Sequence, residues 1–589
     1  MSDFSTILVK DSVIGDIMSD IPFAVKSGAS NKTMQRFPST SASNSSLIFQ
    51  ITVPSENVVI DRGVLINTGL SFTMTAGNAL GAGNIGAVPI GSKAFDYGVT
   101  DSLQAFPMAS LMTTATASIN NTTVSVNLQD ILPSILRLNN SRELYRYNST
   151  TPSLPDQAYA RYIDGVGANN NPLAGYSNSS YDVDLNPRGA HPASIVITRT
   201  DGVSGATDNS PLAVNANDTW VIEFSTVVAE PLFLSPFIFG DPEFNLGGLL
   251  GVNSMNFSFN IDATCKRLFS TANPYIRTIG LGTSANPNGF TASGVIGTQN
   301  IPSSPSLLFQ FLSTQPSDLI ETKNVIGMYD MPRYLTSSAN TTSIAPQGSA
   351  TLTSSNLQIN QLPDLFIINV RKPMNSQTIQ DASAFMTINN ISINLNNQSG
   401  LLSSASAYDL WRMSVKNGST QSFSEFGGLS QSSNATSGVG TFTNTTGSLL
   451  IISPSYDLSL PDYLAGGGSL GNYNFQFQVG VSNTLSATGG DAITPEICVI
   501  CANPSILTTQ QGVSAIFSGL LTKEIVLNAK SRQQASAMKS AEIKRMIGGN
   551  MLNMPLHGIV RQACRRLGGV SSGGVPSGGV SSGGMKSLC

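Results

Sequence analysis

The chain has 589 residues, more than a single hydrophobic core usually supports, so at least two domains are expected. Charged residues make up only 11% of the chain, against about 25% in an ordinary soluble protein. A disordered chain is excluded, because such chains are poor in apolar residues and strongly charged, whereas here 40% of residues are hydrophobic and the formal net charge is −4.

The first residues, MSDFSTILVKDSVIGDIM, include acidic side chains and no apolar core of the signal-peptide type. No run of about 18 apolar residues follows anywhere in the chain. We therefore expect neither export by a signal peptide nor a membrane span. Residues 1–36 are predicted to form an N-terminal arm.

Short segments with apolar residues at alternate positions then recur, separated by Gly, Pro and Asn, which is the pattern of strands and turns. A first series lies at 45–53, 62–75, 115–127, 218–228 and 254–262. A second series lies at 306–313, 351–361, 364–371, 384–396, 447–454, 472–481 and 496–502. The pattern predicts a mainly β protein with domains at 37–265 and 306–521, joined by a linker at 266–305.

The two series share a weak internal duplication. Ile119–Asn127 resembles Ile388–Asn394, and each is followed by a short helix-like piece, at 128–137 and 406–415. Further on, 241–260 resembles 461–478, where a Gly-rich loop precedes an alternating Asn-Phe strand. The spacing between these landmarks is longer in the first copy, which predicts an insertion loop at about 138–216. Such a loop either carries a recognition function or is merely decorative.

The five cysteines, Cys265, Cys498, Cys501, Cys564 and Cys589, are too few and too scattered for a disulfide framework, which indicates a reduced intracellular protein. Cys498 and Cys501 form a C-x-x-C inside the apolar run EICVICA, with no second Cys or His pair to complete a zinc site. Both are predicted to be buried strand residues.

Residues 522–549 contain good helix formers and are predicted to be helical. The last segment, 550–589, is a basic, Gly/Ser-rich tail that we expect to be flexible. Residues 522–589 hold ten Lys or Arg against two acidic residues. The basic candidates for non-specific contact with nucleic-acid phosphates are Lys544, Arg545, Arg561, Arg565 and Arg566. A solvated positive tail without a partner is the alternative.

Catalytic signatures are missing from the sequence. The two histidines, His191 and His557, have no metal-ligand companion at helical or hairpin spacing, and neither a nucleophile elbow nor a P-loop occurs. Gly-rich stretches precede strands rather than helices, so they are expected to be turns and not phosphate cradles. We expect no enzyme activity, no metal site and no cofactor.

One short motif suggests processing. Met546-Ile547-Gly548-Gly549-Asn550 resembles the substrate pattern of adenovirus-type maturation cysteine proteases, which cleave after the second Gly. Residues without a Cβ suit an extended strand entering a narrow protease cleft. A helix C-cap explains Gly548 and Gly549 equally well. If cleavage occurs, residues 550–589 are released.

Several segments in order resemble the double jelly-roll major capsid proteins of virophages and polinton-like viruses, of the adenovirus-like DNA virus lineage. They are FPSTSASNSSLIFQITVP (37–54), VVIDRGVLI (58–66), LQAFPMASLMTTATASINN (103–121), GANNNPLAGY (167–176), FMTINNISINLNNQSGLLSSAS (385–406), SFSEFGG (422–428) and TKEIVLNA (522–529). The resemblance spans most of the chain, although the Gly/Ser-repeat tail does not match the family pattern.

The resemblance implies two consecutive eight-stranded jelly rolls, followed here by a short helical basic C-terminal tail. It also implies a homotrimer that forms a pseudo-hexameric capsomer and tiles an icosahedral shell around a double-stranded DNA genome. Implied partners are penton and minor capsid proteins, a viral maturation cysteine protease and, for the basic tail, genome DNA. The protein would be assembled inside the host cell and located in the virion, with the 138–216 insertion as an outer tower.

Two other protein classes share the composition. A secreted or surface-layer β-sandwich adhesin would need an export sequence. A carbohydrate-active β-sandwich enzyme would need aromatic platforms, and the chain holds only two tryptophans, Trp220 and Trp411.

Overall fold

The fold was analysed in a computed structural model. It describes residues 29–43, 45–55, 57–76, 101–103, 106–138, 193–200, 219–237, 248–262, 269–271, 290–296, 304–314, 324–336, 343–377, 384–433, 440–458, 460, 470–485 and 492–518. None of the described helices is long and apolar enough to cross a membrane.

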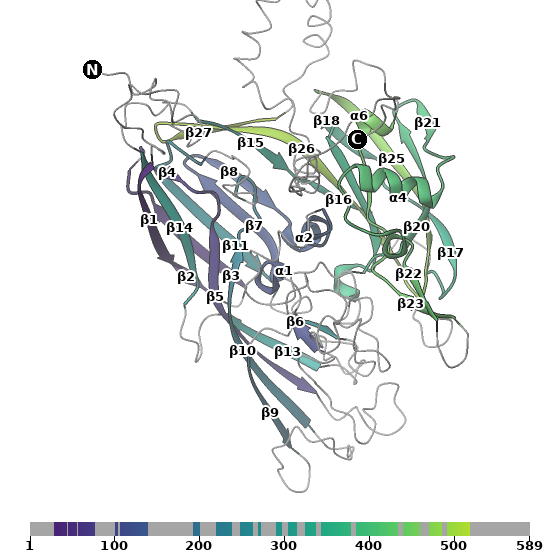
Figure 1. The fold of residues 1–589 in the computed structure, drawn as a ribbon, viewed down its shortest axis with the longest axis horizontal. Coiled ribbons are helices and arrows are strands. Elements are labelled where there is room, and N and C mark those ends of the chain that lie inside the picture. The colour runs from purple at the N-terminus through teal and green to yellow at the C-terminus, as the bar shows by residue number, and fades with distance from the viewer. Residues whose placement is uncertain are drawn as a thin grey trace, which may run out of the picture.

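The first domain consists of two facing antiparallel sheets (Figure 1). One sheet has the order β1-β14-β5-β10-β9, from Ala29–Pro38, Ser306–Thr314, Leu65–Ala76, Thr219–Pro231 and Ser194–Thr200, with β4 (Val59–Ile60) and β13 (Phe290–Ile296) added. The other has the order β2-β3-β11-β7-β8, from Ser41–Ala42, Ser46–Thr52, Ser254–Ile261, Met112–Ile119 and Thr122–Val126. Helices α1 (Pro107–Leu111) and α2 (Leu128–Leu136) and the small β6–β12 pair (Asp101–Leu103 and Phe269–Thr271) complete it.

The second domain repeats this plan. Its first sheet has the order β15-β26-β19-β24, from Asn324–Asp330, Glu496–Gln510, Leu365–Arg371 and Leu450–Ile452, with β16 (Arg333–Thr336) and β27 (Val513–Ser518) also paired to β26. Its second sheet has the order β17-β25-β20-β21, from Ser349–Thr353, Leu470–Ser482, Thr387–Leu395 and Gln398–Leu401, with β18 (Leu357–Gln361) paired to β25. The remaining elements are η7 (Met374–Ser376), α4 (Ala407–Lys416), α5 (Phe423–Phe426), α6 (Pro454–Asp457) and the hairpin β22–β23 (Leu429–Ser433 and Gly440–Asn444).

The two domains correspond strand by strand. The order β1-β14-β5-β10 matches β15/β16-β26-β19-β24, and β3-β11-β7-β8 matches β17/β18-β25-β20-β21. Two four-stranded sheets with these neighbours make a jelly roll. The prediction of a mainly β chain with two consecutive eight-stranded jelly rolls is confirmed.

Alternation of apolar and polar residues builds each core, because successive side chains of a strand point to opposite faces. In β11, Met255, Phe257 and Phe259 are buried while the residues between them are exposed. In the second jelly roll the ring of Phe366 packs edge-on against Phe475 and Phe477, with centroids 4.8 and 5.3 Å away. The buried Phe rings of each domain therefore lie between its two sheets.

The internal duplication is present, but its register differs from the prediction. The matching residues are Asn120, in the β7–β8 turn, and Asn396, in the β20–β21 turn, both with positive φ, of 52° and 49°. Each donates its backbone N–H to the strand beside it, Asn120 to Ser254 and Asn396 to Asn474, over 2.9 Å. The segment 388–390, which was predicted to match this turn, lies inside β20 instead.

Two predicted domain boundaries were wrong. β14, predicted to open the second domain at residue 306, pairs with β1 and β5 and is the closing strand of the first jelly roll. Residues 29–36 of the predicted arm belong to β1, an exposed strand with little apolar alternation. β1 was not predicted because it buries little of its surface, whereas β14 was predicted as a strand but assigned to the wrong domain, because alternation does not state which sheet a strand joins.

The predicted linker and insertion also contain strands. β12 and β13 lie within 266–305 and pair with β6 and β5. β9, SIVITRT, lies within 138–216 and extends the first sheet beside β10. The remainder of the insertion, and the predicted helical segment and tail at 522–589, lie outside the described residues.

Candidate functional site at the interface between the jelly rolls

Strands β19 and β24 and the first seven residues of β26 are buried on both faces, which distinguishes this part of the sheet from one that faces solvent. All seven residues of β19 are buried. Phe366, Ile368 and Val370 belong to the core of the second jelly roll. Leu365 and Ile367 belong to the apolar cluster of the first. A strand covered on both sides reads as a continuous apolar run, as FII does here.

β26 is divided between the two cores in the same way. Cys498 and Ile500 belong to the cluster of the first jelly roll, and Val499 and Cys501 to that of the second. Burial raises the pKa of the Cys498 thiol to about 11 and also raises the pKa of Cys501, so both are neutral thiols at pH 7. The prediction that both cysteines are buried strand residues is confirmed.

Helix α2 fills the space between the domains. Its apolar residues Leu128, Ile131, Leu132 and Ile135 recur at helical spacing and are all buried. Pro133 lies inside the helix, and Arg137 donates from Nη1 to its carbonyl oxygen over 2.7 Å. The helix belongs to the first jelly roll by sequence, yet it contacts the second (Figure 1).

Four charged side chains meet beside α2. Asp130, on the helix, forms ion pairs with Arg371 of β19 and, over 2.5 Å, with Arg333 of β16. Arg371 donates from Nε to Glu496 of β26 over 3.0 Å. Burial raises the pKa of Glu496, and Arg371 offsets part of that rise. The cluster is neutral in sum, so its charges compensate one another in a poorly solvated place.

A second contact lies at the end of α2. The backbone N–H and the hydroxyl of Thr420 both donate to the carbonyl oxygen of Arg137, over 2.8 and 2.7 Å. The Arg137 guanidinium also lies 4.8 Å from the centroid of the Phe385 ring. Thr420 and Phe385 belong to the second jelly roll, so both ends of α2 are attached to it.

The β26–β27 hairpin makes the third contact. The backbone N–H of Ser514 donates to Oδ1 of Asn121 over 2.8 Å, and the Thr122 hydroxyl donates to the carbonyl oxygen of Ser514 over 2.7 Å. Gly512 donates to the carbonyl oxygen of Gly251 over 3.0 Å. The last strands of the second jelly roll therefore end on loops of the first.

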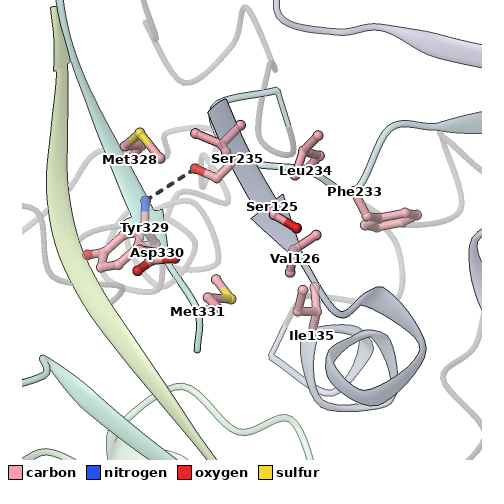
Figure 2. Close-up of a pocket in the computed structure, with 11 residues that line it drawn as sticks. Ser125, Val126, Ile135, Phe233, Leu234, Ser235, Met328, Tyr329, Asp330 and Met331 are labelled. Atoms are coloured by element: carbon pink, nitrogen blue, oxygen red, sulfur yellow. Dashed lines mark hydrogen bonds between the residues drawn. The ribbon is translucent and has the colours of Figure 1, made fainter. Parts of the chain in front are cut away.

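A cavity of about 20 Å³ remains in this interface, between β8, α2 and β15 (Figure 2). Its walls include Val126, Phe233 and Met331, and the N–H of Tyr329 donates to the Ser235 hydroxyl across it, over 3.2 Å. A space of this volume holds roughly one water molecule, whereas ligand pockets span some hundreds of Å³. No group of three or more His, Cys, Asp and Glu suited to a metal ion occurs among the described residues.

Two models of known protein families match this chain, one for each domain. The family model of the Sputnik virophage major capsid protein first domain matches residues 2–312, and that of the major capsid protein V20 C-terminal domain matches residues 331–505. The chain belongs to the virophage major capsid protein family. The first-domain match ends inside β14, in agreement with the corrected boundary.

Individual members of the family agree. The chain is 27% identical over 547 residues to the putative capsid protein V20 of Sputnik virophage, covering 91% of this chain and 83% of that protein. A chain of the Sputnik virophage structure matches with a TM-score of 0.70 at 25% identity, covering 91% of this chain and 98% of that one. The mavirus major capsid protein has the same fold, with a TM-score of 0.64 at 14% identity over 90% of this chain and 97% of that one.

Virophage major capsid proteins are structural components of the virion and are not enzymes, and they assemble with one another into the capsid lattice. The interface described above is therefore a structural site. It holds the two jelly rolls of one capsid protein in a single orientation.

The candidate cleavage segment Met546–Asn550 and the basic residues Lys544, Arg545, Arg561, Arg565 and Arg566 are all outside the described residues. The ion cluster was missed. Its signal is present, because Asp130 lies inside an apolar run, and Arg371 and Glu496 lie at the ends of apolar runs, in a chain that has few charges.

Proposed function

We propose that this capsid protein forms a homotrimer, that the trimer is a pseudo-hexameric capsomer, and that capsomers assemble inside the host cell into an icosahedral shell around a double-stranded DNA genome. The strand-by-strand repetition of one jelly roll within the chain carries this proposal. One chain supplies two nearly equivalent blocks, so three chains supply six. The doubly buried sheet favours it further, because it holds the two blocks in a fixed orientation.

The oligomeric state of the purified full-length chain tests the capsomer. Light scattering after size exclusion is expected to give three times the chain mass of 61.8 kDa. Negative-stain images are expected to show blocks with a six-lobed outline. A chain that stays monomeric up to its solubility limit contradicts the proposal.

Capsomers of this shape leave fivefold positions and seams that six-lobed blocks do not fill, and we assign these to penton and minor capsid proteins. Cross-linking of intact particles followed by mass spectrometry is expected to join this chain to such proteins. Cross-links confined to copies of the chain itself argue against them.

Cleavage by a viral maturation cysteine protease after Gly549 is the proposed processing step. Mass spectrometry of protein from mature particles is expected to find a C-terminus at Gly549, and a Gly549→Val variant is expected to retain Cys589. An intact Cys589 terminus in wild-type particles contradicts the proposal.

The basic residues of the C-terminal segment are proposed to bind genome phosphates without sequence preference. Removal of one cationic side chain that neutralises a phosphate is expected to reduce the slope of log affinity against log salt by about 0.9 for duplex DNA. Replacing Lys544, Arg545, Arg561, Arg565 and Arg566 with Gln in the uncleaved chain is therefore expected to flatten the salt dependence of binding to random duplex. An unchanged slope contradicts this role.

A further inference from the structure

Helices α2 and α4 occupy corresponding places in the two jelly rolls. α2 follows β8, the last strand of its sheet, and α4 follows β21, the last strand of the matching sheet. α2 is buried against the second jelly roll of the same chain. Of the residues of α4, only Leu410 and Ser414 are buried, so the helix keeps an outer side that is not covered within the chain.

The outer side of α4 carries an aromatic cluster formed by Tyr408, Trp411 and Phe423, the last from α5. The three rings touch pairwise, with centroids 5.3 to 5.5 Å apart. Tyr408 and Phe423 are nevertheless 50% and 44% exposed. Exposed aromatic groups of this kind are typical of the centres of protein interfaces.

Local structure holds this cluster rigid. Ser406 and Asp409 form a capping box at the start of α4, and Ser422 and Glu425 form one at the start of α5. The Trp411 indole N–H donates to the carbonyl oxygen of Gln421 over 2.9 Å. A preorganised surface loses little conformational entropy on binding, which favours a contact role.

The surface that receives α2 has a counterpart too. Within the chain, α2 contacts the outer face of the β26-β19-β24 sheet, where Ile367 lies opposite Ile451 and Ile500. The matching sheet of the first jelly roll is β14-β5-β10, where Leu65 lies opposite Pro231 and Leu308. Leu65, Pro231 and Leu308 are only partly buried, and Val227 on the same face is 38% exposed.

The register supports this match. In the second jelly roll, Asn369 follows Ile367 by two residues and is paired with Cys498. In the first, Asn67 follows Leu65 by two residues and is paired with Ser306. The side-chain oxygens of both asparagines are buried without a hydrogen-bond partner. Two residues further, Arg371 is replaced by Gly69. The face of the first jelly roll therefore lacks the arginine of the ion cluster and suits an apolar, aromatic partner.

We propose that the Tyr408–Trp411–Phe423 cluster of one chain docks on the outer β14-β5-β10 face of the first jelly roll of a second copy. β1 and β14 lie on the side of the first jelly roll turned away from the second (Figure 1). The donor and receiving surfaces are thus different patches on one molecule, and a head-to-tail contact of this type closes into a trimeric ring when it relates neighbouring copies by a threefold rotation. The inference rests on the proposed trimer and names the surfaces that form it.

Charged substitutions on each surface test the proposal in the full-length chain. Tyr408→Asp/Phe423→Asp alters the aromatic cluster, and Val227→Arg alters the receiving face. Each variant is expected to be monomeric. The dissociation constant of the contact between copies is expected to rise at least about thirtyfold, because loss of a hot-spot residue costs about 2 kcal/mol or more of binding free energy. Tyr456→Asp, at an aromatic residue 66% exposed on α6, is the matched control and is expected to remain trimeric.

Mixing the two kinds of monomer gives the sharper result. A head-to-tail contact leaves one intact pair of surfaces in the mixture, so sedimentation is expected to show dimers and no trimers. Trimers from either variant alone overturn the proposal, as does a mixture that stays monomeric. Circular dichroism and melting temperature check folding, and the milder Tyr408→Ser/Phe423→Ser pair replaces any variant that unfolds. A wild-type chain that is monomeric would instead contradict the proposed trimer itself.

Discussion

The Asp130 carboxylate and the Arg371 guanidinium form an ion pair across the boundary between the jelly rolls, with side chains 9% and 2% exposed. Glu496 accepts a hydrogen bond from Nε of the same guanidinium. Each charge is thus neutralised by a partner from a different element. Removing one partner leaves the other buried and uncompensated, which costs far more than loss of a surface ion pair.

Asp130→Asn is therefore expected to lower the free energy of unfolding by about 3–5 kcal/mol, because Arg333 and Arg371 then share only Glu496. Denaturant unfolding followed by circular dichroism measures the change. Glu223→Gln, at an exposed carboxylate of β10, is the control and is expected to stay within about 0.5 kcal/mol of wild type. Equal effects of the two substitutions would show that the cluster contributes nothing specific.

Glu230 is expected to make stability depend on pH. It is fully buried and accepts the backbone N–H groups of Met108 and Ala109 over 2.8 and 2.9 Å. Burial raises its pKa from 4.5 to about 7, because desolvation disfavours the carboxylate. A folded pKa above the unfolded one means that the stabilisation is complete below pH 4.5 and is lost as the pH rises through about 7.

The comparison of wild type with Glu230→Gln isolates this effect. At pH 5 the Glu230 carboxyl is protonated in the folded state, and the wild type is expected to be the more stable, because both carboxyl oxygens retain acceptor capacity whereas the Gln amide has one acceptor oxygen for the two N–H groups. By pH 8 that advantage is expected to shrink by about 3 kcal/mol, as one pKa unit corresponds to about 1.4 kcal/mol. Urea titrations at both pH values measure the difference. An advantage that grows with pH would contradict the sign.

Asn120 is expected to resist replacement at its turn. Its φ of 52° favours Asn or Gly, and its Oδ1 accepts the N–H of Asn253 over 2.9 Å. The Asn120 Nδ2 also donates to the carbonyl oxygen of Gly251 over 3.2 Å. Asn120→Gly loses these side-chain hydrogen bonds, at about 1 kcal/mol each. Asn120→Ala loses them and also strains the backbone, which costs about 1–2 kcal/mol more. Thermal unfolding ranks the variants, and equal losses for Gly and Ala would argue that backbone strain is unimportant here.

Two glycines with similar φ provide a matched test of close packing. A Cβ on Gly447, at φ 83°, would lie 1.9 Å from the carbonyl oxygen of Phe385. At Gly400, with φ 77°, the nearest atom would be 3.7 Å away. Gly400→Ala is expected to cost about 1–2 kcal/mol. Gly447→Ala must also displace backbone and is expected to yield little soluble protein, as measured by expression and melting temperature. Similar behaviour of both variants would contradict this account.

The sequence predicts the second jelly roll better than the first. In β11 and β25 strict alternation marks which side chains enter the core. β1 gives no such signal, because as an edge strand it buries little of its surface. β14 has a clear pattern, but its neighbours β1 and β5 lie far from it in sequence. Alternation identifies a strand without stating which sheet it joins.

The interface follows the same logic. The apolar runs around Ile367 and Ile500 show that both faces of their strands are covered. They do not show that α2 provides the cover, because Asp130 and Arg371 are 241 residues apart. The asymmetry between α2 and α4 is visible only once the two helices are placed on equivalent strands.

β26 enters the second jelly roll with Glu496 and ends, through its hairpin with β27, on the turn at Asn121. Cleavage of the chain between β14 and β15 would expose the mainly apolar interface between the jelly rolls on both fragments. We therefore expect neither fragment to be soluble on its own. The entire polypeptide is therefore the smallest unit that folds. Thermal unfolding is expected to be one cooperative transition, rather than a separate transition for each domain.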